Sequence, residues 1–152
     1  MNRHCHSARC KLAHCTRGLR LGSLALSPYF RLQTEEAARL LDGLVSVDVG
    51  QLEKSGIPKG RYPIIEGIQA GAIRYERADP REHWQTWRQL LAGRRGDCED
   101  LTAAVVAELK YNGVPARTYV YKSGPKLYHV VVQTDRWGFL DPSLAAGMEG
   151  NG

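Results

Sequence analysis

The hydrophobic pattern of this chain changes its period after Asn112-Gly113, and that change constrains the fold more than any other feature. Upstream, apolar residues recur at helical spacing in the segments that begin near Thr34 and Cys98. Downstream, three runs with alternating character, PARTYVYK, KLYHVVVQ and RWGFLD, are separated by SGP and TDR, which predicts an antiparallel meander. Helices followed by strands favour an α+β fold in which the helix that carries Cys98 packs on a C-terminal sheet.

Charge divides the chain into a basic leader and a balanced domain. Residues 1–34 contain six Lys or Arg and no acid, whereas the remaining residues contain 15 bases and 16 acids. We therefore predict a leader over residues 1–33 with little order and a single domain over residues 34–152. The balanced domain does not suggest a nucleic-acid partner. No apolar run approaches the roughly 20 residues that span a bilayer, so no membrane partner is expected either.

The leader contains six potential metal ligands, but their spacing matches no common zinc finger. These ligands are His4, Cys5, His6, Cys10, His14 and Cys15. Three interpretations stay open: a zinc site, a tail without order, and upstream sequence translated from an early gene start; we favour the tail. Cys98 is the only cysteine of the domain, which excludes a disulfide framework and favours a reducing, cytoplasmic setting.

Local signals predict where the other helices begin. Thr34 can cap a helix, and Asp79-Pro80 predicts the start of another, with Trp84 and Trp87 on its core-facing side. Gly and Pro recur over residues 46–72, which predicts a loop that contains at most one short helix or strand.

The segment GRRGDCEDLTAAVVAEL places Cys98 in the first turn of its helix. Asp97 can cap this helix, with Asp100 completing a capping box. Unpaired backbone N–H groups of a first turn stabilise a thiolate and can bind an oxyanion. Gly96 would leave room for a substrate backbone. The acids at 97, 99 and 100 would raise the thiol pKa, and we interpret them as caps that face away from the sulfur.

A thiolate nucleophile needs a base, and the domain offers His83 and His129. His129 lies within a predicted strand, which favours it as the base. If the TDR turn is centred on Asp135, residues whose numbers sum to 270 face one another, and this pairs His129 with Asp141. A different turn would make the pair diagonal. The sequence thus predicts a Cys98-His129-Asp141 triad; the alternative is that each of the three is a structural residue.

Four segments carry a resemblance to a known family: GDCEDLTAAVVAEL, GVPAR, YHVVV and LDPS. Together they resemble the transglutaminase-like superfamily of cysteine enzymes and, more narrowly, the short transglutaminase-like cysteine proteases of bacteriophages and prophages. The resemblance covers about residues 60–148 and implies a papain-like core with Cys98, His129 and Asp141 as catalytic residues. Members of the superfamily include transamidases, proteases, amidases and inactive scaffolds, so the reaction stays open.

We accordingly expect a cysteine hydrolase or acyltransferase that acts on amide bonds of a protein or peptide through a thioester, as a protease or amidase, with no cofactor and no metal. The alternatives are a transglutaminase and a non-catalytic phage structural or assembly protein that keeps the fold. The expected location is the cytoplasm of a bacterial host or a virion, where phage structural proteins would be partners. The side-chain donor of the oxyanion site is open between Trp84 and Gln85, although Trp84 is better explained as core.

Overall fold

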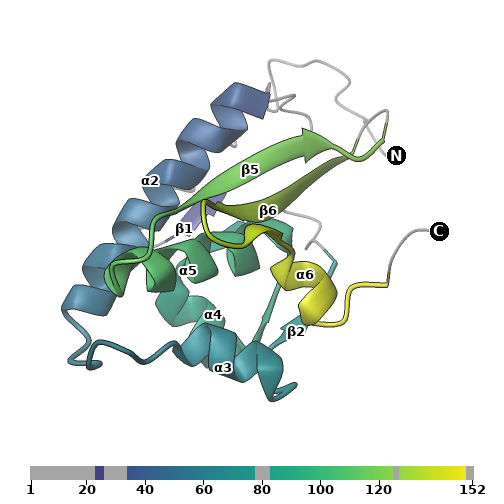
Figure 1. Cartoon of the computed structure of the whole chain (residues 1–152). Helices are drawn as coiled ribbons and strands as arrows, with labels where there is room; N and C mark the ends of the chain where they lie inside the picture. Colours follow the sequence, from purple (N-terminus) through teal and green to yellow (C-terminus); the bar gives the residue numbers. More distant parts are fainter. Residues whose placement is uncertain (1–22, 26–33, 78–82, 125–126, 150–152) are drawn as a thin grey trace, which may run out of the picture.

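The computed structural model describes residues 23–25, 34–77, 83–124 and 127–149 (Figure 1). Three residues of the predicted leader, Ser23–Ala25, form strand β1. The cysteines and histidines considered for zinc lie outside the described residues, as do Asp79 and Pro80. In the described ranges, no helix has the length and apolar character needed to cross a membrane.

The fold is α+β, as predicted, with helices packed on a small antiparallel sheet. The three-stranded sheet has the order β5-β6-β7, β1 pairs with β3, and β2 runs parallel to β4. In chain order after β1, the bounds of these strands and of the helices are α2 (Thr34–Glu53), α3 (Pro63–Gln69), β2 (Arg74–Tyr75), β3 (His83–Gln85), α4 (Trp87–Gly93), β4 (Arg95–Gly96), α5 (Cys98–Tyr111), β5 (Ala116–Lys122), β6 (Tyr128–Thr134), β7 (Gly138–Leu140) and α6 (Pro142–Ala145).

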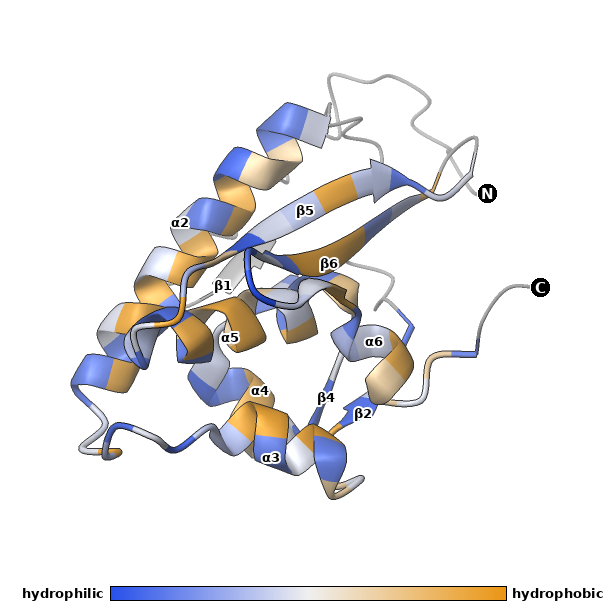
Figure 2. Ribbon diagram, viewed as in Figure 1, coloured by the Kyte–Doolittle hydropathy of each residue, from blue (hydrophilic) through white to orange (hydrophobic). Residues whose placement is uncertain are grey.

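Helix α5 lies at the centre of the fold. Every residue from Asp100 to Leu109 is buried, and the helix contacts α2, α3, α4, α6 and the strands β5 and β6. On the sheet side, Val130 and Val132 are 1% and 0% exposed. Figure 2 shows the hydrophobic colouring of much of α5 and β6. A helix that is buried on all sides is the expected outcome of the apolar run LTAAVVAEL.

Buried carboxylates attach the short helices to the long ones. Glu108 of α5 accepts hydrogen bonds from the backbone N–H groups of Ile64 at 2.7 Å and Ile65 at 3.1 Å, in the first turn of α3. Asp48 of α2 accepts one at 2.7 Å from the backbone N–H of Trp87, the first residue of α4. First-turn N–H groups lack partners within their own helix and favour negative charge, so these acids fix where α3 and α4 begin.

Two predicted helix boundaries were wrong. The helix expected from Asp79-Pro80 begins only at Trp87, because residues 83–85 form β3 and Thr86 precedes α4 with its N–H bonded to the Gln89 side chain at 2.9 Å. Helix α2 extends to Glu53, into the segment predicted as loop, since Asp48 and Leu52 continue its buried face. Trp84 and Trp87 are 4% and 2% exposed, which confirms both as core residues.

Replacing Asp48 with Asn should remove a pH-dependent loss of stability. Burial raises the pKa of Asp48 from 3.8 to about 7, although the Trp87 N–H opposes the shift. The folded protein therefore holds this proton more tightly than the unfolded chain, and stability falls as the pH rises from about 4 to about 7. The free energy of unfolding of Asp48→Asn, minus that of wild type, should therefore be roughly 2 kcal/mol larger at about pH 8 than at about pH 5.

Urea unfolding of both proteins at the two pH values measures this difference. Glu66→Gln is the matched control, because Arg61 holds the pKa of the exposed Glu66 at about 2 and this carboxyl does not titrate in the window. The control should change stability equally at both pH values. If Asp48→Asn also behaves in that way, the buried carboxyl is not the source of the pH dependence.

Candidate active site

Cys98 is the first residue of α5, and the predicted capping box of this helix is confirmed. The Asp97 carboxylate accepts from the backbone N–H groups of Glu99 at 3.1 Å and Asp100 at 3.2 Å. Asp100 in turn accepts from the Asp97 N–H at 3.4 Å. Cys98 is only 8% exposed, so the helix end places the sulfur just below the surface.

His129 and Asp141 are brought together as predicted, but through a different strand register. Val132 faces Leu140 across β6 and β7, so the turn is centred one residue later than expected and the pair is diagonal rather than directly opposed. Side chains on diagonal positions can still meet. The His129 Nε2 atom lies 2.8 Å from Asp141 Oδ2, and the imidazole is buried at 7% exposure.

Asp141 also caps helix α6. Its second oxygen, Oδ1, accepts from the backbone N–H groups of Ser143 at 3.0 Å and Leu144 at 3.1 Å. One carboxylate therefore starts a helix and holds the imidazole. Because a carboxylate oxygen only accepts, Nε2 of His129 carries the hydrogen of this bond, which leaves Nδ1 as the ring nitrogen with a free lone pair.

The sulfur and the imidazole lie on elements that meet at Val130. Thr102, one helical turn after Cys98, donates from its hydroxyl to the Val130 carbonyl at 3.0 Å. The Val130 N–H faces the sulfur and lowers the thiol pKa. His129 directly precedes Val130 in β6, and Tyr121 packs edge-on against its ring with centroids 5.6 Å apart. The structure thus brings the start of the cysteine helix to the strand that carries the paired histidine.

Glu99 does not face away from the sulfur, contrary to the sequence prediction. The Cys98 thiol donates to Glu99 Oε2 at 2.8 Å. Burial, and next the charge of Glu99, raise the thiol pKa far above its usual range, and these effects outweigh the Val130 N–H. Backbone N–H groups hold Asp97 and Asp100, whereas the Glu99 carboxylate lies against the thiol and beside the Asp97 carboxyl, whose pKa is raised by burial and next by the Glu99 charge. In this arrangement the thiol is protonated.

Gly96, expected to leave room for a substrate backbone, and Gln85, an open candidate for the oxyanion donor, have structural roles. A Cβ at Gly96 would lie 2.8 Å from Leu90 Cδ1 and 2.9 Å from Asp100 Cβ, so its missing side chain makes room for packing. The Gln85 amide donates to the Arg95 carbonyl and to Asp100 Oδ2, both at 2.9 Å. Both amide hydrogens are used, and Gln85 is not the oxyanion donor.

Three neighbours of the site were missed from sequence: Tyr75, Thr102 and Tyr121. Burial raises the pKa of Tyr75 and, together with the charge of Asp141, that of Tyr121, and Cys98 contributes in the same direction to both. Thr102 could have been found, because four residues after Cys98 it shares the same helix face. Tyr121 lies directly opposite His129 across β5 and β6, whereas a turn centred on Gly124 of SGP would have placed Tyr119 there.

The charged groups around the site form no metal centre in the described part of the chain, where no three His, Cys, Asp or Glu side chains gather suitably for an ion. Arg94 and Arg95 are exposed, and Arg95 of β4 pairs with Glu76 at 3.5 Å. Comparison with known proteins gave no match to a family model, a curated protein or a solved structure. Function is therefore inferred from the geometry of Cys98, His129 and Asp141.

Replacing Gly96 with Ala should destabilise the protein by about 1–3 kcal/mol, because the new methyl group overlaps Leu90 Cδ1 and Asp100 Cβ. The control is Gly43→Ala on α2, where a Cβ meets nothing within 4 Å. That change should stabilise the helix by about 0.5–1 kcal/mol. Thermal unfolding of both variants measures the contrast, and an unchanged midpoint for Gly96→Ala would contradict the packing role.

Replacing Glu99 with Ala should make the thiol more reactive at neutral pH. Removing the carboxylate takes away the charge and the hydrogen bond that raise the thiol pKa. Each unit by which the pKa falls increases the thiolate fraction roughly tenfold. The alkylation rate of the Cys98 peptide by iodoacetamide, followed by mass spectrometry over a pH series, should show a midpoint shifted to lower pH.

Glu53→Ala, at the exposed end of α2, is the control and should leave the alkylation profile of Cys98 unchanged. A mere gain in access would speed alkylation at every pH without moving the midpoint. An unmoved midpoint in the Glu99 variant would therefore show that this carboxylate does not govern the thiol.

Proposed function

We propose that this protein is a cysteine hydrolase that cleaves amide bonds of a protein or peptide through a thioester on Cys98. The observation that carries the proposal is the 2.8 Å bond between His129 Nε2 and Asp141 Oδ2, formed on the strand that meets the start of the cysteine helix. Resemblance of the surrounding segments to transglutaminase-like cysteine proteases supports a papain-like core of this kind. A phage origin of the protein would agree with that resemblance.

Each residue has a distinct role in the proposed reaction. His129 Nδ1 takes the thiol proton while Asp141 holds the opposite ring nitrogen, and the Cys98 sulfur attacks the carbonyl carbon. The C–N bond breaks, the amine leaves with the proton from the imidazolium, and water then hydrolyses the thioester. Backbone N–H groups in the first turn of α5 stabilise the oxyanion. The Glu99 carboxylate has to leave the sulfur before the thiol can transfer its proton to His129.

Water is the favoured acceptor because it requires no second binding site. A transglutaminase, in which an amine attacks the thioester, is the nearest alternative. A non-catalytic phage structural or assembly protein is the second candidate. The observation that favours this candidate is the hydrogen bond from the Cys98 thiol to Glu99, which keeps the sulfur protonated.

Mass spectrometry of a peptide library after incubation with the protein tests these alternatives. We expect cleaved peptides with wild type and a loss of at least about a hundredfold in rate with Cys98→Ser and with His129→Gln, since both remove the nucleophile–base pair. His83→Gln is the matched control and should retain activity, because His83 lies on β3 and not on the site strands.

The products separate the alternatives by mass. Cleavage adds water, deamidation exchanges ammonia for water, and crosslinking joins two peptides with loss of ammonia. Unchanged peptides, together with circular dichroism spectra that show all variants folded, would support the non-catalytic candidate instead.

A further inference from the structure

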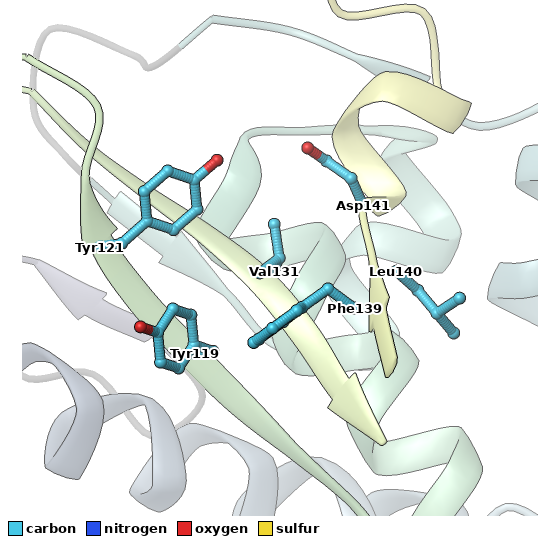
Figure 3. A pocket seen from close by; sticks show the side chains of 6 residues that line it. All are labelled: Tyr119, Tyr121, Val131, Phe139, Leu140 and Asp141. Carbon is cyan, nitrogen blue, oxygen red and sulfur yellow. The ribbon is translucent and has the colours of Figure 1, made fainter. Parts of the chain in front are cut away.

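The outer face of the sheet carries an open hollow of about 480 Å³ (Figure 3). Tyr119 and Phe139 are 43% and 57% exposed within it, which is unusual for large apolar side chains. The hollow is lined by Tyr119, Tyr121, Val131, Phe139, Leu140 and Asp141. In Figure 3 the oxygens of Tyr121 and Asp141 lie toward one end of the hollow, and the rings of Tyr119 and Phe139 lie toward the other.

The hollow begins at the candidate active site. Asp141, which lines it, is bonded to His129 at 2.8 Å, and Tyr121, which also lines it, packs edge-on against the His129 ring. The remaining rings extend from this end: the centroids of Tyr119 and Tyr121 are 6.2 Å apart, and those of Tyr119 and Phe139 are 5.0 Å apart. Rings that pack on one another form a surface that loses little entropy when a ligand binds.

Strand alternation places a cation at the far end of the same face. Residues two apart on β5 share a face, so Arg117 follows Tyr119 and Tyr121. Arg117 is exposed, and its Nε donates to Gln133 Oε1 at 3.0 Å, which uses one of its five N–H donors. The cross-strand pairs that define this face are Tyr121 with His129, Tyr119 with Val131, and Arg117 with Gln133.

We infer that this face binds the substrate chain on one side of the scissile amide, as an extended peptide with a large apolar residue and an acidic residue two positions from it. This inference rests on the proposed function, which places the scissile amide at Cys98. The apolar side chain packs on Tyr119 and Phe139, and the carboxylate pairs with Arg117. Side chains on one side of an extended peptide repeat at about 6.6–6.8 Å, which matches the step from Tyr119 to Arg117 along β5.

Binding is measured with the full-length Cys98→Ser protein, which cannot turn over its ligand. The probes are fluorescently labelled heptapeptides that contain Phe and Asp two positions apart, in either order, and their Phe-to-Ala and Asp-to-Asn analogues. We expect one order of Phe and Asp to bind more tightly than the other. For that order, fluorescence anisotropy should show the Phe-to-Ala analogue binding roughly tenfold more weakly than the parent peptide. The Asn analogue should bind more weakly as well, by a factor that shrinks as salt is added.

Protein variants assign these preferences to residues. Phe139→Ala should weaken binding of the Phe peptide roughly tenfold and remove the preference over its Ala analogue. Arg117→Gln should remove only the preference for Asp over Asn. Trp137→Ala is the matched control, because Trp137 is an aromatic residue with 47% exposure that does not line the hollow, and it should leave both preferences unchanged.

The outcomes separate this inference from the proposed function. Selective binding without cleavage by wild type would support the peptide site and refute the hydrolase. Cleavage that ignores the Phe and Asp positions and tolerates Phe139→Ala would support the hydrolase and overturn the peptide site. Sedimentation that shows a dimer of wild type and a monomer of Phe139→Ala would also overturn it, by assigning the face to a second copy of the chain.

Discussion

The burial of helix α5 is the constraint on which the rest of this structure depends. Its polar groups cannot reach water, so each must find a partner inside the protein. Glu108 accepts hydrogen bonds from backbone N–H groups of α3, and Asp100 accepts one from the Gln85 N–H of β3. Thr102 donates a hydrogen bond to the Val130 carbonyl of β6. Each of these buried polar groups therefore attaches at least one neighbouring element, and Glu108 also holds α4 through the Trp87 indole. The position of Cys98 relative to His129 follows from the Thr102 contact.

The site balances two opposing electrostatic influences on one sulfur. The start of a helix and the Val130 N–H favour a thiolate, whereas burial and the Glu99 charge favour the thiol, and the second pair dominates. Asp97 illustrates the same conflict: burial and the charge of Glu99 raise its pKa although backbone N–H groups hold it. The described conformation thus keeps the sulfur as a thiol, and the proposed chemistry requires the Glu99 carboxylate to leave the sulfur for water or another partner.

Sequence was sufficient for the elements whose signals are local. Helix α5 has the predicted bounds, because a capping box starts it and Asn112-Gly113, with Gly113 at a φ of 79°, ends it. The start of α4 has a local signal, the capping box of Thr86 and Gln89, which was overlooked in favour of Asp79-Pro80. The contact with Asp48, 39 residues away, which accepts its first N–H, could not be predicted locally. The predicted contact between His129 and Asp141 formed in spite of the incorrect register because side chains can reach diagonal partners. The direction of Glu99 was missed because three neighbouring acids look equivalent until their backbone partners are known.

The three hydrogen bonds of Asp141, one to His129 and two to the start of α6, bear on the order in which the site forms. On the ribosome, Cys98 and His129 emerge before Ser143 and Leu144, whose N–H groups hold the carboxylate that orients the imidazole. The orientation of the imidazole is therefore fixed only after α6 has been made, so this part of the fold forms after the cysteine helix and the central strand of the sheet.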